Sequence, residues 1–395
     1  MNQRHIDRQA ATALASLREV IDAVAEGRPA DNTLGRLFRD HREWGSRDRR
    51  FISAIVYSYF RWRGWLEGIE LPRAAALAYS LDAIEPNDAQ TALAGKEVPA
   101  WGALPLTEKM SAVTAEIVRT LTVEMLVPAW LPAAIPDADA NRLIESFQRR
   151  PPTWIRPLRG NEEKVFAALT ATGIPTRRDD RIAGAIACDG NMNLIEIRRA
   201  IGNVFEVQDI ASQAVGFICD PKPGQRWLDV CAGAGGKSLH LADLMNNRGE
   251  VIATDVRATA LEELAERAAK SWRTCIRTLK PGAYVEGLFD GALVDAPCSG
   301  IGTWSRNPDM RWRTGETAVA EKAALQIEIL DRAADSVKAG GTLVFAVCTI
   351  SRAETTDIVT KFLEWRRDFA HEATQCLLPE YGPGDGMFIE KFRRK

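Results

Sequence analysis

The feature that most constrains the fold is a series of short apolar runs, each of which ends in a loop of glycines or polar residues. The first run, Trp227–Val230, leads directly into CAGAGGK (231–237), and a helical pattern of leucines follows. A second run, Val251–Ala253, is followed closely by Asp255. Strand, glycine-rich turn, helix and strand make a βαβ unit. Its glycines would admit a nucleoside-containing cofactor, and its terminal carboxylate would hold the ribose diol.

Two later apolar runs end in residues that carry chemistry. Phe289–Val294 is followed by Asp295-Ala296-Pro297-Cys298, and Thr342–Val347 is followed by Cys348. Alternating strands and helices predict a mostly parallel sheet that binds ligands at the carboxyl ends of its strands. The glycine loop, both carboxylates and both cysteines should therefore meet at one edge of the sheet.

Composition sets the wider limits. A chain of 395 residues is long enough for two or three domains, and its formal charge of −2 requires that any nucleic-acid binding come from local basic patches. No apolar run approaches about 18 residues, so no membrane segment is expected. The seven cysteines contain no CxxC pair, which disfavours a zinc site and a disulfide framework. We expect a cytoplasmic protein without a metal ion.

The pattern of residues changes twice along the chain. Residues 1–125 have only helical periodicity and predict an all-α domain, in which 72–94 is one helical stretch. Residues 126–206 predict a small α+β module, with short strands over 182–188 and 194–197. Residues 207–395 predict the α/β domain that contains the motifs above.

The glycine loop itself favours one class of cofactor. Its spacing fits neither the GxxxxGK[ST] pattern of a Walker A loop nor a GxGxxG dinucleotide fingerprint. S-adenosylmethionine has no pyrophosphate, and it needs glycines, a ribose carboxylate and room for a sulfonium. The loop and Asp255 favour it over a nicotinamide cofactor, which stays the alternative at this point.

The cysteine pair indicates a chemistry. C5 of cytosine is too weak a nucleophile to attack a methyl sulfonium, but a thiolate that adds to C6 turns the ring into an enamine that can. Asp295, protonated or sharing a proton, could stabilise N3 and the exocyclic amine. From spacing alone, Cys298 and Cys348 are interchangeable in this scheme, and either could instead be a buried structural cysteine.

Several longer motifs resemble one family in its own order. The sequence is similar to the RNA (cytosine-5) methyltransferases, most closely to their bacterial small-subunit rRNA branch (Sun/Nop2-like). The resemblance implies a Rossmann-like class I methyltransferase domain, an RRM-like middle module and, from GSRDRRFISAIVYSYFRWRGWLE (45–67), a NusB-like RNA-binding domain at the N-terminus. The motifs that carry it are QDIASQ (208–213), LDVCAGAGGKS (228–238), DAPCSGIGTWSRNPDMRWR (295–313), GGTLVFAVCTIS (340–351) and DGMFIEKF (385–392).

The resemblance assigns roles to individual residues. It implies that Cys348 is the nucleophile and that Cys298 helps to release the product. It places Lys237 near cofactor and substrate, Asp255 on the ribose and Asp295 on the base. The residues expected to bind S-adenosylmethionine are Cys231, Ala232, Gly233, Ala234, Gly235, Gly236, Lys237, Asp255, Arg257 and Asp295.

The family also sets expectations for partners. We expect a monomer that acts on RNA, with rRNA as the expected substrate and tRNA as the alternative. The proline-rich segment 149–159, with Arg149, Arg150, Arg156 and Arg159, is predicted to contact the RNA backbone. A competing hypothesis is a catalytically weak RNA-binding or ribosome-assembly protein that retains the fold. Further arginines in the helical region predict either a solvated face or a phosphate-binding face: 36, 39, 42, 47, 49, 50, 61 and 63.

Overall fold

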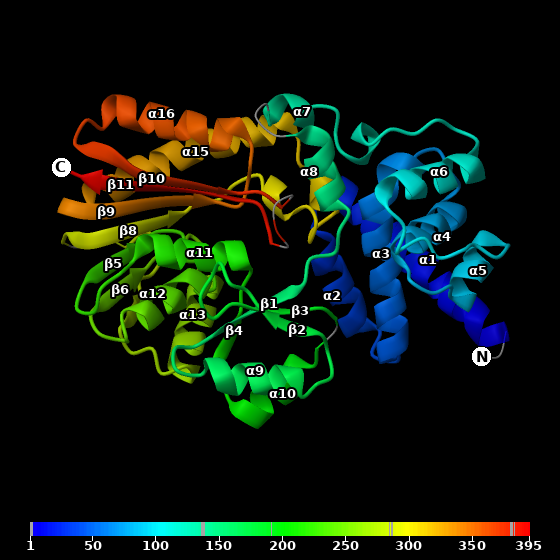
Figure 1. Ribbon diagram of the computed structural model, residues 1–395, viewed down its shortest axis with the longest axis horizontal. Coiled ribbons are helices and arrows are strands. Elements are labelled where there is room, and N and C mark those ends of the chain that lie inside the picture. The colour runs from blue at the N-terminus through cyan, green and yellow to red at the C-terminus, as the bar shows by residue number, and fades with distance from the viewer. Residues whose placement is uncertain are drawn as a thin grey trace. The chain divides into compact units, whose positions relative to one another are not determined.

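The computed structural model describes residues 3–135, 139–190, 192–283, 285, 287–379, 382 and 384–395, which form two compact units. Unit 1 comprises Met1–Arg150 and Trp304–Gly315, and unit 2 comprises Pro151–Thr303 and Glu316–Lys395. Figure 1 labels their elements. The boundaries between the two units lie after residues 150, 303 and 315. The predicted division into three domains, with boundaries at residues 125 and 206, stays a prediction.

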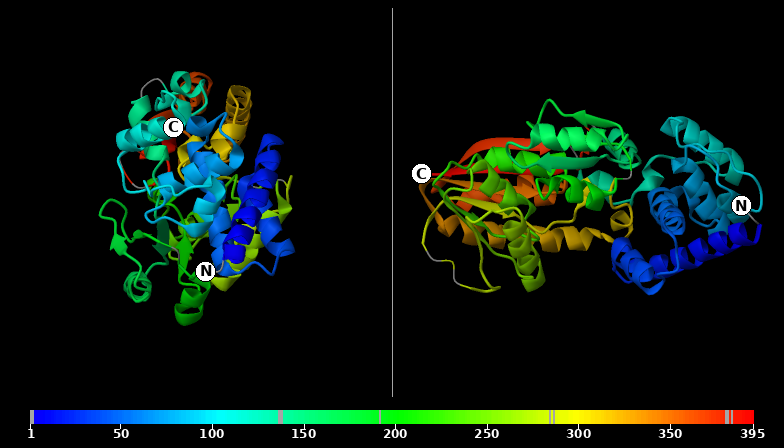
Figure 2. Two further views of the ribbon diagram at one scale, coloured as in Figure 1. Left: turned by 90° about the vertical axis from the view of Figure 1, so that its right-hand side faces the viewer. Right: turned by 90° about the horizontal axis from the view of Figure 1, so that it is seen from below.

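In the described part of unit 1 every regular element is helical, as the sequence predicted (Figure 2). Pro86 and Asn87 divide the stretch 72–94 into two helices rather than one, because Asn87 accepts a hydrogen bond from the Ala89 N–H and starts a new helix. The elements are α1 (Gln3–Ala25), α2 (Ala30–Asp40), α3 (Ser46–Leu66), α4 (Leu71–Asp82), α5 (Asp88–Ala94), α6 (Leu106–Ile117), η1 (Glu124–Leu126), α7 (Leu131–Ala134), α8 (Ala140–Phe147) and α14 (Met310–Arg313).

The segment Trp304–Gly315 is built into the interior of unit 1. Arg311 is fully buried, and its guanidinium donates to the carbonyls of Leu126, Phe147 and Trp304 at 3.0–3.2 Å. Trp312 donates its indole N–H to the Phe60 carbonyl at 2.6 Å. A late segment of the chain therefore completes the core of the N-terminal helices.

Unit 2 begins with a small four-stranded antiparallel sheet of order β2-β3-β1-β4. The predicted strand at 194–197 is wrong: Leu194, Ile197 and Ile201 recur at helical spacing on α10 and pack against the core of this module. The module is α+β as predicted, and its likeness to an RRM stays a prediction. Its elements are β1 (Thr153–Pro157), α9 (Glu162–Thr170), β2 (Thr176–Arg178), β3 (Ile186–Cys188), α10 (Leu194–Ile201) and β4 (Phe205–Val207).

The rest of unit 2 is organised around a seven-stranded mixed sheet of order β10-β11-β9-β8-β5-β6-β7. Its elements are α11 (Ile210–Cys219), β5 (Arg226–Asp229), α12 (Gly236–Leu244), β6 (Glu250–Ala253), α13 (Ala258–Lys270), β7 (Ile276–Thr278), β8 (Phe289–Asp295), η2 (Ile301–Thr303), α15 (Glu316–Asp335), β9 (Val337–Val347), η3 (Arg352–Glu354), α16 (Thr356–Trp365), β10 (Phe369–Leu377) and β11 (Met387–Arg394).

The sheet has helices on both faces. Strands β7, β6, β5, β8 and β9 are parallel, whereas β11 runs antiparallel to both β9 and β10. Helices α15 and α16 cover one face, and α11, α12 and α13 cover the other (Figure 1). This burial on both sides explains the apolar run Leu343–Val347, in which every residue is fully buried. The strand order reverses between β5 and β8, the position at which such sheets bind ligands.

Candidate active site

The glycine loop and Asp255, predicted to bind the cofactor, lie in contact with each other. Gly235 has a φ of +86° at the start of α12, and an added Cβ would lie 2.0 Å from Leu264, so only glycine fits there. Gly233 donates its N–H to Asp255 Oδ2 at 2.8 Å, and Arg257 donates backbone and side-chain N–H groups to Oδ1 at 2.9 and 3.1 Å. Burial would raise the pKa of Asp255, but these hydrogen bonds outweigh it and lower the pKa.

A cavity of about 560 Å³ lies beside this loop, a volume within the range of small-molecule sites. Of the predicted cofactor residues, Cys231 and Asp255 line it. Val256 and the turn Lys280–Gly282 line it as well, and sequence reasoning missed them. Burial raises the pKa of Cys231 to about 12, so this thiol stays protonated. A carboxylate at the edge of a cavity of this size suits the adenosine part of S-adenosylmethionine.

The remaining predicted loop residues hold the backbone in place. Ala232 donates its N–H to the Thr254 carbonyl at 2.9 Å, and the Ala234 carbonyl accepts from Arg267. Gly236 and Lys237 are the first two residues of α12. The assignment of each loop residue to the cofactor stays a prediction.

Lys237 and Asp295 form a shielded ion pair. Lys237 Nζ lies 2.6 Å from Asp295 Oδ2, and the lysine side chain is only 11% exposed. Burial would lower the pKa of Lys237, but the attraction of Asp295 outweighs it and raises the pKa. Lys237 is therefore charged, and its ammonium group donates a hydrogen bond to Asp295.

The two predicted cysteines lie in contact. Cys298 Sγ and Cys348 Sγ are 3.3 Å apart, although 50 positions separate them in the chain. The hydrogen bond with Cys348, together with burial, raises the pKa of Cys298 well above its ordinary value. Cys298 therefore keeps its proton, and the roles of the two cysteines stay a prediction.

Two buried carboxylates near these residues were missed by sequence reasoning. Asp229, fully buried at the end of β5, accepts a hydrogen bond from Ser238 at 2.6 Å, and burial raises its pKa to about 7. Glu354, fully buried in η3, accepts from the residues that follow each cysteine, Ser299 and Thr349. For Asp229 the signal was its place just before the glycine loop; for Glu354 the sequence offered none.

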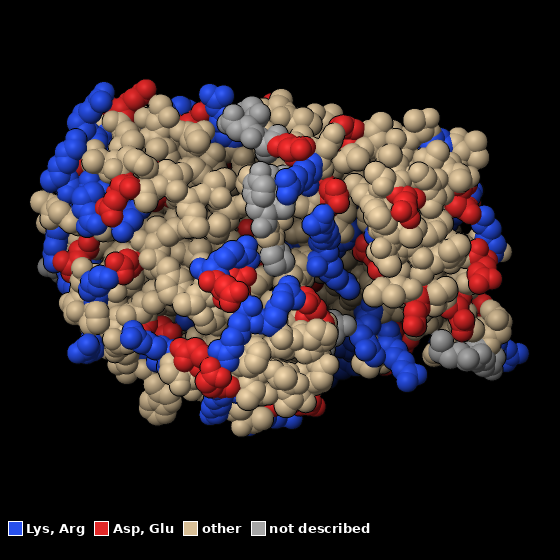
Figure 3. Space-filling model, in the orientation of Figure 1, with Lys and Arg blue, Asp and Glu red and all other residues tan. Residues whose placement is uncertain are grey.

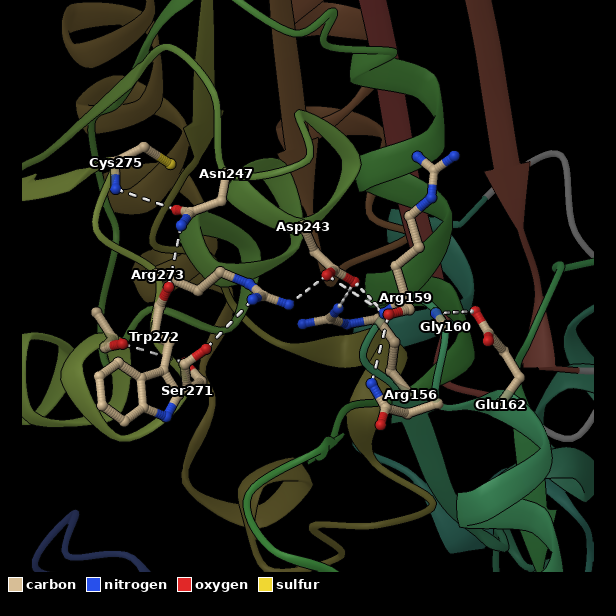
Figure 4. Close-up of polar contacts among 12 residues, drawn as sticks. Arg156, Arg159, Gly160, Glu162, Asp243, Asn247, Ser271, Trp272, Arg273 and Cys275 are labelled. Carbon is tan, nitrogen blue, oxygen red and sulfur yellow. Dashed lines mark hydrogen bonds and ion pairs between the residues drawn. The ribbon is translucent and has the colours of Figure 1, made fainter.

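One predicted RNA contact is wrong. Arg156 is 4% exposed, with Nη1 3.4 Å from Asp243 and Nε donating to Gln208 at 2.6 Å. Asp243 also binds Arg273 and the Arg159 backbone N–H, whereas the Arg159 side chain points away from it (Figure 4). Arg156 lies on β1, and both faces of this strand are covered. Its guanidinium therefore links the small sheet to α12 through Asp243 and cannot reach RNA.

The helical arginines also divide by environment. Arg61 is buried and donates to Asp82 at 3.1 Å, and Arg36 pairs with Glu19. Arginines 39, 42, 47 and 50 are exposed on or near α2 and the start of α3. Positive and negative side chains are mixed over the face drawn in Figure 3, in keeping with the small net charge.

Two further properties concern metal ions and membranes. In the described part of the chain, no three His, Cys, Asp or Glu side chains are grouped so as to hold a metal ion. No helix among the described residues is long and apolar enough to cross a membrane.

The sheet, the glycine loop with its acidic partner, and the thiol pair have the arrangement expected of a methyltransferase with a Rossmann-like fold. The family model described as 16S rRNA methyltransferase RsmB/F matches residues 217–393. Together with the Bacillus subtilis relative described next, this match shows that the chain belongs to this family, as the resemblance indicated. The family uses S-adenosylmethionine, the cofactor that the sequence predicted.

Relatives support the family assignment over most of the chain. The Bacillus subtilis protein named probable ribosomal RNA small subunit methyltransferase B is 30% identical over 70% of this chain and 68% of its own length. The Pectobacterium atrosepticum protein named ribosomal RNA small subunit methyltransferase B is 32% identical over 67% and 66%. The match to the Synechocystis relative, 31% identical over 65% of this chain, spans 63% of that protein, which is less than two thirds of it.

Solved structures show the same fold. The crystal structure of PH0851 aligns with a TM-score of 0.75 at 23% identity, over 96% of this chain and 99% of that chain. The structure of NSun6 from Pyrococcus horikoshii with SFG aligns with a TM-score of 0.59 at 18% identity, over 67% and 96%.

Proposed function

We propose that this chain is an S-adenosylmethionine-dependent RNA cytosine-5 methyltransferase that acts on small-subunit rRNA through a covalent adduct between Cys348 and C6 of cytosine. The observation that carries the proposal is the 3.3 Å contact between Cys298 and Cys348, at the sheet edge where β8 also presents Asp295. C5 methylation of a pyrimidine needs a thiolate nucleophile and a group that holds the base, and this edge of the sheet carries residues of both kinds.

The residues act in a definite order in this proposal. The Cys348 thiolate attacks C6, and the electron pair of the C5–C6 double bond moves into the ring and its exocyclic groups. Asp295, fixed by Lys237, accepts a hydrogen bond from the exocyclic amine and orients the base. S-adenosylmethionine, when bound, would supply the methyl group to C5 and leave as S-adenosylhomocysteine. A base then removes the C5 proton, and the double bond re-forms as the C6–S bond breaks.

Cys298 contributes to the last step. Because it keeps its proton, its S–H can donate to Cys348 Sγ as that sulfur leaves as a thiolate. Charge that develops on a leaving group is stabilised by a donor already in place. Loss of Cys298 should therefore slow the release of RNA more than the formation of the adduct.

The exposed arginines are proposed to bind the RNA backbone. Residues 39, 42, 47 and 50 of unit 1 and Arg159 of unit 2 are exposed, as phosphate contacts require. We propose that the helical unit and the small sheet module both contribute to RNA binding, in agreement with the NusB-like and RRM-like resemblances. An unpaired cytosine is the expected target, because it does not have to be flipped out of a duplex.

The test uses purified enzyme, small-subunit rRNA and S-adenosylmethionine, with bisulfite sequencing of the RNA and denaturing gels for covalent complexes. Wild type should produce 5-methylcytosine, and Cys348→Ala should produce none and form no complex. Cys298→Ala should accumulate the covalent complex, whereas Cys275→Ala, at a thiol outside the site, should behave as wild type. RNA binding without methylation by wild type would instead favour the assembly-protein hypothesis.

A further inference from the structure

A buried hydrogen-bond network lies directly behind the two cysteines. At its centre is Glu354, which is fully buried in the short helix that follows β9. Its Oε1 accepts the backbone N–H of Ser299 at 2.8 Å, and its Oε2 accepts the hydroxyl of Thr349 at 3.1 Å. The Ser299 hydroxyl also donates to Oε2, and the two hydroxyl oxygens are 2.8 Å apart. The carboxylate thus binds the residue that follows each cysteine.

A second side chain extends the network to the other side of Cys298. Gln326 of α15 is fully buried and donates to Glu354 Oε1 at 3.0 Å. The same amide nitrogen lies 3.0 Å from the carbonyl of Pro297. The Cys298 loop is therefore held both before and after the thiol, and Glu354 binds directly to one of these points and through Gln326 to the other.

Burying the Glu354 carboxylate has a free-energy cost that the hydrogen bonds around it must offset. Burial raises the pKa of Glu354, because removing a carboxylate from water is costly. Several donors on the two oxygens offset that cost. An apolar residue of similar size would fill the same space without the cost, so packing alone does not account for a polar side chain here. What Glu354 adds is two terminal atoms that can form hydrogen bonds with two separate loops at once.

We propose that Glu354 is the positioning residue of the thiol pair, tying the Pro297–Ser299 loop to the Cys348–Thr349 loop and thereby setting the distance between the two sulfurs. The consequence for catalysis rests on the proposed function, whereas the consequence for the geometry of the thiols does not. Glu354 contacts neither sulfur by hydrogen bond, and it acts through Ser299 and Thr349.

Substitutions at Glu354 separate its hydrogen bonds from its charge. In Glu354→Gln, the remaining oxygen can accept from the Ser299 N–H while the amide donates to the hydroxyls of Ser299 and Thr349, which can turn to accept. The glutamine should keep the loops together without a charge. Glu354→Ala removes every link and leaves the donors of both loops unsatisfied.

The first measurement needs no catalysis. Diamide oxidises two neighbouring thiols to a disulfide, and mass spectrometry of the digested protein measures the rate of Cys298–Cys348 cross-linking. Glu354→Ala should slow this rate at least about tenfold, and Glu354→Gln should stay within about threefold of wild type. The second measurement is turnover on rRNA, where kcat of Glu354→Ala should fall about 100-fold with KM for RNA unchanged, as expected for a misplacement near 1 Å.

Each outcome has a defined meaning. A folded Glu354→Ala variant that cross-links at the wild-type rate overturns the proposal, and so does a Glu354→Gln variant as impaired as alanine. If thermal melting shows that Glu354→Ala does not fold, Ser299→Ala and Thr349→Val replace it. Each of these variants should slow cross-linking several-fold. If either variant cross-links at the wild-type rate, the proposal is refuted. Dependence of cross-linking on Glu354 without any methylation by wild type would support the positioning role and reject the proposed function.

Discussion

Asp229 should make the stability of unit 2 depend on pH in an unusual direction. Its pKa in the folded protein is raised from 3.8 to about 7 by burial, so the native state binds a proton that the unfolded chain releases near pH 4. For a carboxyl group with a raised pKa, the stabilising contribution is full below the unfolded pKa and is lost as pH rises through the folded one. This difference in pKa corresponds to about 4 kcal/mol in total, of which about 2.5 kcal/mol is lost between pH 5 and pH 8.

The matched variant is Asp229→Asn, which keeps an oxygen for Ser238 but cannot titrate. Urea unfolding of both proteins without cofactor, at intervals from pH 5 to pH 8, gives two curves of unfolding free energy. Their difference should change by about 2.5 kcal/mol in favour of the variant as pH rises. Parallel curves would show that Asp229 titrates normally, and the assignment of a proton to this buried carboxyl group would be wrong.

Two further predictions concern RNA binding and packing. Arg159→Glu should weaken rRNA binding and reduce the salt slope of binding by about 1 without loss of stability. Arg156→Glu should instead destabilise unit 2 by more than about 3 kcal/mol, because it places a second buried acid beside Asp243. If salt titrations of RNA binding and thermal melts show the same effects for both variants, the distinction between the two arginines is wrong. Gly302→Ala should cost about 3 kcal/mol in chemical unfolding, because its Cβ would lie 2.0 Å from the Gly386 carbonyl oxygen. Gly315→Ala, which meets nothing within 4 Å, is the control and should stay within about 0.5 kcal/mol.

The part of the site that the sequence could predict is the part governed by the sheet. Asp295, Cys298 and Cys348 follow directly after apolar runs, and parallel strands bring their carboxyl ends to one edge whatever the rest of the chain does. The contact between the sulfurs follows from that rule. The choice between them depended on the family resemblance, because spacing along the chain does not distinguish the two thiols.

What the sequence could not predict depends on partners that are distant along the chain. Arg156 reads as a surface charge in a proline-rich segment until Asp243, 87 positions later, is placed against it. Glu354 is one of several acids near the end of β9, and its role requires Ser299 and Gln326 to converge on it. Short local patterns carry no information on such convergence, because tertiary packing decides it.

The placement of Trp304–Gly315 within unit 1 has a consequence for how such a protein can change in evolution. The chain passes between the units three times, after Arg150, after Thr303 and after Gly315. The helical unit is therefore not a separate N-terminal addition to unit 2. A gene that lost its first 150 codons would leave Arg311 and Trp312 without the carbonyls that receive them. The helical unit and the twelve-residue insertion must therefore be inherited, lost or exchanged together.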